Sequence, residues 1–274
     1  MDNHRERFKN IKRLVVKVGT STITHDNGNL NLRCLDKLGM VLSDVFNTGV
    51  EVILVTSGAI GVGVGEMHLK HRPVTIGGKQ AAAAVGQCVL MNIYSKFFGE
   101  YGKTVGQILL TKDIIEDEER KQNVINTFNN LFEHGVIPIV NENDSVATDE
   151  LEYGEKKLFG DNDTMSAIVA SVVKADLLII LSDVDGFYSG NPKIDDCCKK
   201  IENIFDIDDK IKSCAGGKGS ELGTGGMITK LTAAKLVMEE GIDMVLANGS
   251  NPLIIYDILD GKNLGTVFVG KQKA

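Results

Sequence analysis

The 274-residue sequence contains no tryptophan, only four prolines and only five cysteines. With so little proline, and with no Ser-rich or low-complexity tract, nothing resembles an inter-domain linker, and we expect one domain over residues 1–274. The cysteines are odd in number and form no CxxC pair, and Cys197 and Cys198 are adjacent. This pattern suits neither a zinc site nor a disulfide framework, so free thiols in a reducing cytoplasm are expected.

Long apolar runs and excess positive charge are also absent. No apolar run approaches the roughly 18 residues that a membrane span needs, and the N-terminal MDNHRERFKNIKR lacks the apolar stretch of a signal peptide. The formal net charge is −7, which excludes a global basic field for nucleic acid. We therefore expect a cytoplasmic protein without a membrane or nucleic-acid partner, in which any phosphate is bound by a local site.

Short, continuously apolar runs alternate with segments of helical period. The runs predict strands at 13–18, 51–56, 105–110, 136–141, 177–182 and 244–247. Continuous rather than alternating apolarity is typical of strands covered by helices on both faces. Among the helical segments, one face is predicted to contain Val85, Val89, Ile93 and Phe97. The alternation predicts an α/β fold with a mostly parallel sheet, and small residues after the strands favour an open sheet over a closed barrel.

The loops after the strands carry the unusual residues. Lys17 lies inside an otherwise apolar strand and is followed by Gly19, Thr20 and Ser21. Burying a lysine there is costly unless it meets an anion, although an edge strand could leave its ammonium group in solvent. The P-loop order of residues is absent, so a Walker-type site is excluded.

A second loop, SGAIGVGVGEM, follows the strand at 51–56 and has four glycines. Such a turn can cradle phosphate, but the acidic residue that a dinucleotide site needs about 20 positions later is missing. Ser57 could instead bind an anionic substrate; it does not lie in the GxSxG of a hydrolase.

Polar and acidic residues cluster after the strand at 136–141. They are Asn141, Asn143, Asp144, Asp161, Asn162 and Asp163. Turns and helix caps account for some of them, but six exceed what capping needs. The cluster could bind Mg²⁺, orient lysines or hold the ammonium group of an amino acid, and the residues alone leave these alternatives open.

Another glycine-rich segment, GTGGMITK at 223–230, is predicted to open a helix and so to form an anion site beside Lys230. The DVDG sequence at 183–186 lacks the closing glutamate of a calcium loop, and the histidines show no zinc-site spacing. The charged segment 190–220 is expected to be an irregular surface excursion.

Two lysines, glycine-rich loops and an acidic cluster suit phosphoryl transfer, which needs charge neutralisation and positioning. No histidine is placed as an obvious base. A carboxylate acceptor would need none, because it is already ionised near neutral pH. The spacing does not separate this acceptor from a nucleoside monophosphate.

The motifs VVKVGTS, VTSGAI, KQAAAAVGQ, VGQILLT, IPIVNENDSVAT, FGDND, LSDVDGFYSGNP, GTGGMITK and ANGS run in order from about residue 13 to 250. With them the chain resembles the amino-acid kinase family, and especially its members that phosphorylate glutamate. The resemblance implies a three-layer sandwich around a mostly parallel sheet, in one kinase domain. It also implies transfer from ATP to the γ-carboxylate of L-glutamate, giving γ-glutamyl phosphate in the first step of proline biosynthesis.

Residue roles follow from the same resemblance. It implies that Lys17 and Lys230 stabilise the transferring phosphoryl group and that Asp163 orients both lysines. Ser57, Asp144 and Asn162 would hold glutamate. The nucleotide would contact Lys17, Ser182, Asp183, Thr224, Gly225, Gly226, Met227, Ile228, Thr229 and Lys230. Mg²⁺ would be carried mainly by the ATP phosphates, without a dedicated protein site, and segment 190–220 would lie near the nucleotide.

Two departures from the family stand out. Many bacterial members carry a C-terminal PUA domain, which this sequence lacks, and the stretch between Asp144 and Asp161 is a few residues longer than in many members. From the family we expect a homo-oligomer, feedback inhibition by proline and a glutamyl phosphate reductase partner. The two departures could change the oligomeric state and the inhibition by proline. The alternatives are a kinase of the same fold with another acceptor, such as UMP or a phosphonate, and an inactive binding sensor. A sensor would be expected to lack Lys17, Asp163 or Lys230, and all three are present.

Overall fold

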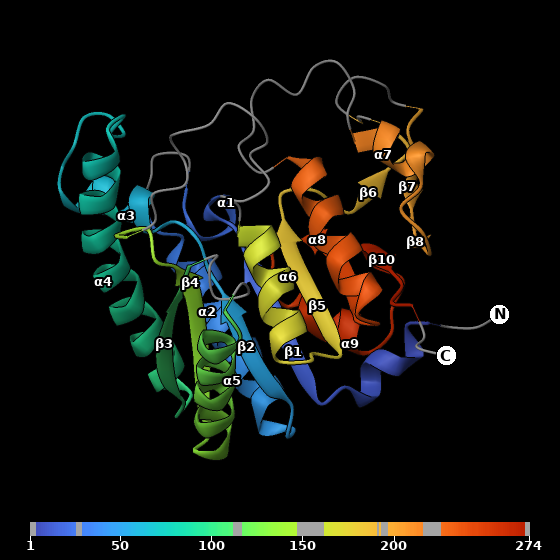
Figure 1. Ribbon diagram of the computed structural model, residues 1–274, viewed down its shortest axis with the longest axis horizontal. Coiled ribbons are helices and arrows are strands. Elements are labelled where there is room, and N and C mark those ends of the chain that lie inside the picture. Colours follow the sequence, from blue (N-terminus) through green and yellow to red (C-terminus); the bar gives the residue numbers. More distant parts are fainter. Residues whose placement is uncertain are drawn as a thin grey trace.

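A computed structural model describes residues 4–25, 29–111, 117–146, 162–190, 192, 197–215 and 226–271 (Figure 1). Its strands are β1 (Arg13–Val18), β2 (Glu51–Val55), β3 (Thr104–Leu110), β4 (Val136–Glu142), β5 (Leu177–Ser182), β6 (Phe187–Tyr188), β7 (Lys200–Ile201), β8 (Asn203–Ile204), β9 (Asp243–Asn248) and β10 (Thr266–Phe268). Its helices are η1 (Glu6–Asn10), α1 (Thr20–Ile23), α2 (Leu32–Asn47), α3 (Ala59–Glu66), α4 (Ile76–Glu100), α5 (Glu118–Glu133), α6 (Asn162–Val172), α7 (Asp209–Ala215), α8 (Met227–Glu239) and α9 (Ile254–Leu259).

Eight of these strands form one open sheet in the order β3-β4-β2-β1-β5-β9-β10-β8. Every neighbouring pair is parallel except β9 and β10. Strands β6 and β7 form a separate antiparallel pair. The predicted open, mostly parallel α/β sheet is therefore confirmed, and all six predicted strands are present within a residue or two of their expected ends.

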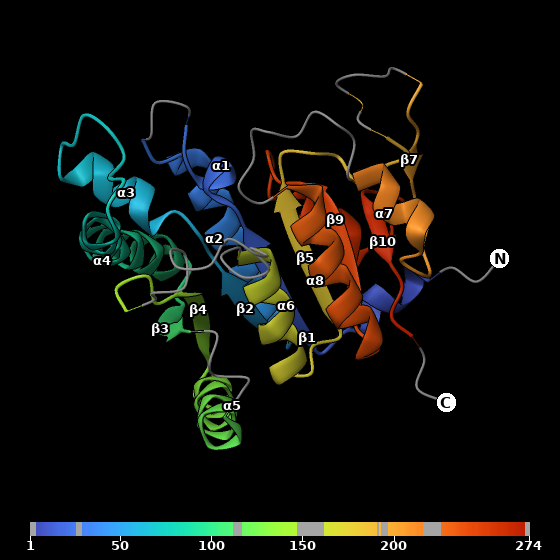
Figure 2. The same ribbon diagram turned by 45° about the horizontal axis from the view of Figure 1, so that its top comes forward.

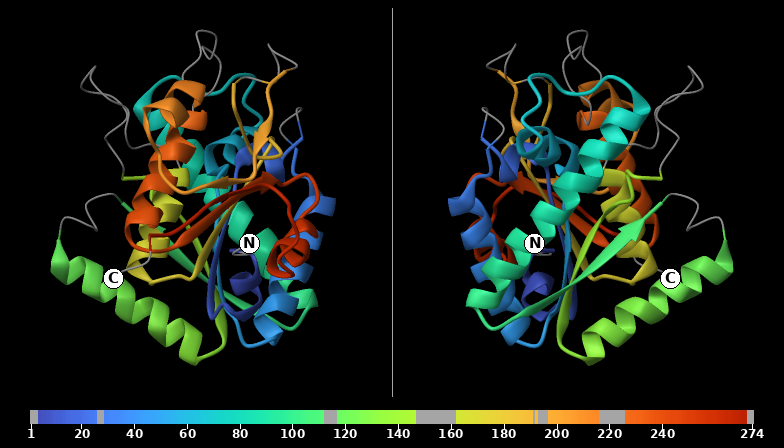
Figure 3. Two further views of the ribbon diagram at one scale, coloured as in Figure 1. Left: turned by 90° about the vertical axis from the view of Figure 1, so that its right-hand side faces the viewer. Right: turned by 90° about the vertical axis from the view of Figure 1, so that its left-hand side faces the viewer.

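Helices cover the sheet on both faces, giving three layers (Figure 3). Successive side chains of a strand point to opposite faces. Thus Leu14, Val16 and Val18 of β1 join the core beneath α2, α4 and α9, whereas Val15 joins the core beneath α5, α6 and α8. Lys17 shares the alternation of Val15, which directs its side chain toward α6 and α8. The functional site described below depends on this direction.

Helix α4 buries a different face from the one that its apolar spacing predicted. Val85 is exposed, while Leu90, Tyr94 and Phe98 are almost completely buried. The other three predicted residues of the face, Val89, Ile93 and Phe97, are only partly buried against the core. This helix is apolar on most sides, so apolar spacing could not single out the buried one.

The glycine-rich segment after β2 forms most of α3 rather than an extended loop. Helices α3 and α4 pack so closely that a methyl group at Gly63 would overlap the backbone of Ala82, and one at Gly86 would overlap that of Ala59. These two glycines therefore serve helix packing and not phosphate binding.

The described part of segment 190–220 contains regular elements. They are β7, β8 and α7, and β8 extends the main sheet by pairing with β10. The strands β6, β7, β8 and β10 have two or three residues each, too few for a periodicity to show in the sequence.

Among the described residues, the five cysteines form no disulfide. Within the described residues, no helix combines the length and the apolar character that crossing a membrane would require.

Candidate active site

Three elements that are far apart in the sequence bring two lysines onto one carboxylate. Lys17 Nζ, near the end of β1, lies 2.6 Å from Oδ1 of Asp163 on α6. Lys230 Nζ, on α8, lies 3.0 Å from Oδ2 of the same residue. Helices α6 and α8 lie side by side, with α6 over β1 and β5 and α8 over β9, which sets this geometry (Figure 2). The structure thus brings together the three residues predicted to be catalytic.

This triad of Lys17, Asp163 and Lys230 is buried and carries one net positive charge. Burial by itself would raise the pKa of Asp163, but the two ammonium groups outweigh it and hold the pKa of this carboxyl below its ordinary value. Asp163 is 0% exposed, so the two lysines and not solvent keep its carboxylate ionised. Two cations sharing one carboxylate leave a surplus of positive charge, which suits a phosphate group.

The N-terminus of α8 adds amide donors next to the triad. Gly226 is the N-cap and provides no capping side chain, so the first amides of this 13-residue helix are not satisfied by such a cap. Thr229 Oγ1 donates to the Gly226 carbonyl at 2.7 Å and lies 3.4 Å from Asp163 Oδ2. Met227 and Ile228 occupy the same first turn, and Ile228 is exposed. Thr224 and Gly225, also predicted to contact the nucleotide, lie outside the described residues.

A cluster of polar side chains from β4, α6 and the residues after β2 lies beside the triad. Asn162, the residue before Asp163, directs its Nδ2 to three acceptors: Ser57 Oγ at 2.6 Å, the Thr56 carbonyl at 2.8 Å and Asn141 Oδ1 at 3.2 Å. The structure therefore joins Ser57 and Asn162, two of the predicted acceptor-binding residues. Asn141 is 1% exposed and completes this group.

The position of Ser57 depends on the tight turn from β2 into α3. Gly58 is the N-cap of α3 and has φ = 95°, in the left-handed region that favours glycine. A Cβ at Gly58 would also lie 3.3 Å from Ile23 Cδ1. Glycine at this position lets the chain turn directly after Ser57 and leaves its hydroxyl at the carboxyl end of the sheet.

Other predicted residues lie at the same edge. Asp144 lies in a turn two residues after β4. Ser182 is the last residue of β5, and its hydroxyl donates to Asp183 Oδ1 at 3.1 Å. The assignment of Ser182 and Asp183 to the nucleotide stays a prediction. Asp161 and most of the longer stretch after Asp144 lie outside the described residues.

The site suits a phosphate better than a bare metal ion. Among the described residues, no group of three or more His, Cys, Asp or Glu side chains is arranged to hold a metal. The positive triad and the N-terminus of α8, whose N-cap Gly226 provides no side chain, instead fit a phosphate group. Chemically, the arrangement can stabilise negative charge on a transferring phosphoryl group.

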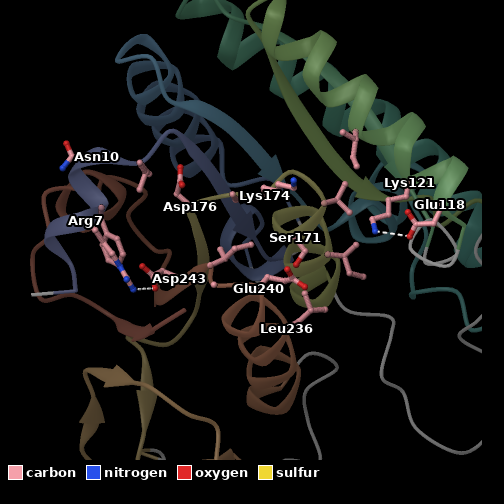
Figure 4. Close-up of a pocket in the computed structure, with 18 residues that line it drawn as sticks. Arg7, Asn10, Glu118, Lys121, Ser171, Lys174, Asp176, Leu236, Glu240 and Asp243 are labelled. Carbon is pink, nitrogen blue, oxygen red and sulfur yellow. Dashed lines mark hydrogen bonds and ion pairs between the residues drawn. The ribbon is translucent and has the colours of Figure 1, made fainter. Parts of the chain in front are cut away.

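A cavity of about 940 Å³ lies elsewhere, at the amino edge of the sheet between η1 and the C-terminal ends of α6 and α8 (Figure 4). Arg7 pairs with Asp243 there, and Lys121 pairs with Glu118. We place the chemistry at the carboxyl edge because the buried lysines are there, whereas the charges of this cavity are largely neutralised in pairs.

Comparison with known proteins decides the family. Residues 12–248 match the amino acid kinase family. The chain belongs to this family. Its fold agrees with two crystal structures of isopentenyl phosphate kinases, one of them the T. acidophilum enzyme in a product complex. They superpose with TM-scores of 0.63 and 0.62 at 15% and 20% identity, covering 93% of this chain and 99% of theirs.

Similar curated proteins match the kinase chain nearly end to end. Glutamate 5-kinase of Clostridium perfringens is 56% identical over 98% of this chain and 99% of its own length. Glutamate 5-kinase of Listeria monocytogenes is 56% identical over 98% of this chain and 97% of its own length. Glutamate 5-kinase of Clostridium acetobutylicum is 51% identical over 99% of this chain and 100% of its own.

Sequence reasoning missed one member of the site of this kinase. Gln87 of α4 is buried, and its Oε1 accepts a hydrogen bond from Asn141 Nδ2 at 2.8 Å. Gln87 lies inside a helix, 54 residues from Asn141, in a motif that carried the family resemblance but no assigned role. No spacing in the sequence indicates such a contact.

Proposed function

We propose that the protein is a glutamate 5-kinase, which transfers the γ-phosphoryl group of ATP to the γ-carboxylate of L-glutamate. The observation that carries the proposal is the buried pair of lysines on Asp163, adjacent through Asn162 to the polar group around Ser57. The near end-to-end likeness to glutamate 5-kinases supports the choice of acceptor.

In the proposed reaction a γ-carboxylate oxygen attacks the γ-phosphorus of ATP. A new O–P bond forms, the bond from phosphorus to the β,γ-bridging oxygen breaks, and ADP leaves with that electron pair. No proton has to move, because the acceptor carboxylate is ionised near neutral pH. This agrees with a site that has no histidine among the residues considered above.

Lys17 and Lys230 are the catalytic residues in this mechanism. Their ammonium groups face the developing charge on the phosphoryl oxygens and weaken the repulsion between two anions. Asp163 is a positioning residue, since its two carboxylate oxygens hold one lysine each. Mg²⁺, brought by ATP, supplies further charge neutralisation on the β- and γ-phosphates.

Substrate roles are proposed for the surrounding residues. Ser57 and Asn162 would bind a glutamate carboxylate, and Asp144 would bind the ammonium group. Ser182, Asp183 and the first turn of α8 would contact the nucleotide, together with Thr224 and Gly225. A position of segment 190–220 near the nucleotide, a cytoplasmic location, a homo-oligomer, inhibition by proline and a reductase partner are further predictions from the family resemblance.

The test is ADP release from ATP·Mg²⁺ with L-glutamate in the presence of hydroxylamine, which converts an acyl phosphate to a hydroxamate. Aspartate, N-acetylglutamate, carbamate and UMP serve as rival acceptors. We expect hydroxamate with glutamate alone. If turnover occurs only with another acceptor, the assignment of the phosphate site stands, but the assignment of the residues that bind glutamate is wrong. ATP binding without any turnover would instead indicate a sensor.

A further inference from the structure

We propose that Gln87 is a positioning residue that fixes the orientation of the acceptor site through Asn141. This inference rests on the proposed function, because it concerns the acceptor of that reaction. It assigns a role to a side chain on α4, a helix from which we have placed no other residue in the site.

The proposal begins with a chain of side-chain amides. Asn141 Nδ2 donates to Gln87 Oε1 at 2.8 Å. The opposite atom of the same amide, Asn141 Oδ1, accepts from Asn162 Nδ2 at 3.2 Å. Asn162 Nδ2 in turn donates to Ser57 Oγ at 2.6 Å. Gln87 is therefore connected to Ser57 through two intervening amides.

The direction of each amide matters because its two ends have opposite hydrogen-bonding character. With Gln87 Oε1 accepting, Asn141 must turn its nitrogen toward α4 and its oxygen toward α6. If Asn141 were flipped, its nitrogen would face the nitrogen of Asn162, and both hydrogen bonds would be lost. The acceptor oxygen of Gln87 thus selects one of the two orientations of Asn141.

Burial makes this selection strong. Gln87 and Asn141 are 8% and 1% exposed, so water cannot readily replace a lost partner. Within the described residues Gln87 Nε2 is buried and makes no hydrogen bond. Retaining an unsatisfied donor is costly, and an apolar side chain of similar length would avoid that cost. A glutamine at this position is therefore explained by its acceptor oxygen and not by packing.

The test is substitution Gln87→Met, which keeps the length and removes the acceptor. Because a partner of a buried amide is lost, we expect KM for glutamate to rise about tenfold. We expect KM for ATP to stay within about twofold, since Lys17, Lys230 and α8 are not connected to Gln87 by these bonds. The change removes one unsatisfied buried donor, Gln87 Nε2, and leaves another, Asn141 Nδ2, without its acceptor, so the thermal unfolding midpoint should stay close to that of the wild type.

Tyr94→Phe is the matched control. Tyr94 lies on the same helix, is also buried, and its hydroxyl lies 2.6 Å from Thr56 Oγ1, beside Ser57. It has no part in the amide chain, so its loss should lower the unfolding midpoint without changing KM for glutamate. A second variant, Gln87→Leu, repeats the removal of the acceptor with another apolar side chain.

The outcomes separate this proposal from the proposed function. If the wild type forms no hydroxamate with glutamate, the proposed function fails. If the wild type does form it, and both Gln87 variants keep wild-type KM for glutamate, the role of Gln87 is overturned alone. If the Gln87 variants affect KM for glutamate and KM for ATP equally and also lower the unfolding midpoint, Gln87 is a structural residue. That outcome also overturns the proposal.

Discussion

Lys17 Nζ lies 2.6 Å from Asp163 Oδ1 at the end of an otherwise apolar, buried strand. Burying that ammonium group without a counter-charge would cost too much free energy. Lys17 can therefore occupy this position only because the first turn of α6 places Asp163 beside it. The same carboxylate also binds Lys230. One residue therefore connects the sheet with both helices that cover the site.

Replacing Lys230 by alanine should lower kcat by about a hundredfold or more, because one of the two charges that stabilise the transferring phosphoryl group is lost. Steady-state kinetics with glutamate and ATP provide the measurement. Lys235→Ala, an exposed change on the same helix, should leave kcat unchanged. Near-normal turnover in Lys230→Ala would remove this residue from the catalytic machinery.

Replacing Asp163 by asparagine should abolish turnover and destabilise the protein by about 3–5 kcal/mol, because two buried ammonium groups lose their counter-charge. Urea unfolding at neutral pH measures the loss. An active, stable Asp163→Asn variant would contradict the positioning role of this carboxylate.

The acid dependence of stability gives a separate test. The pKa of Asp163 is below its ordinary value of 3.8, so its ionised form stabilises the folded state above pH 3.8. This contribution should be lost as the pH falls below 3.8 toward the folded-state pKa. Asp243 has the opposite sign, since burial raises its pKa. Unfolding free energies against pH for Asp163→Asn and Asp243→Asn should therefore deviate from the wild-type curve in opposite directions.

Asp144→Ala should raise KM for glutamate about ten- to a hundredfold while changing KM for ATP little, because a charge-assisted hydrogen bond to the substrate ammonium group is lost. Asp117→Ala removes the N-cap of α5, away from the site, and should affect stability alone. Unchanged glutamate affinity in Asp144→Ala would show that the acceptor is placed wrongly.

The close packing of α3 on α4 predicts opposite effects for two glycines of α4. Gly86→Ala should destabilise the protein by about 1–3 kcal/mol, because its methyl group would overlap the Ala59 backbone. Gly99→Ala meets no atom within 4 Å and should stabilise by about 0.4–1 kcal/mol. Thermal unfolding of both variants checks the sign of each effect, and equal effects would argue against the packing.

The sequence was a good guide where hydrophobic burial decides the structure. The runs at 13–18 and 177–182 are mostly apolar because β1 and β5 lie in the sheet interior, and their predicted bounds are those of the structure. It was a poor guide for α4, whose apolar residues surround the helix, and for β10, which has three residues. Short strands carry too little pattern to predict.

The candidate site was predicted unevenly for a similar reason. A lysine within the apolar run of β1 is a local anomaly that indicates a buried counter-charge, so Lys17 could be found from its own surroundings. The convergence of Asp163 and Lys230 on it was implied only by the family resemblance. Gln87 has no local anomaly, since a polar residue in a long helix is ordinary, and only the folded chain shows its contact with Asn141.

The most direct measurement of the central claim follows an oxygen atom. The enzyme would be given ATP·Mg²⁺, hydroxylamine and glutamate whose γ-carboxylate carries ¹⁸O, and the released phosphate would be analysed by mass spectrometry. Attack by the carboxylate on phosphorus, followed by hydroxylamine attack on the acyl carbon, predicts phosphate with one ¹⁸O together with γ-glutamyl hydroxamate. Unlabelled phosphate without hydroxamate would mean that water, not glutamate, accepts the phosphoryl group, and would contradict the account.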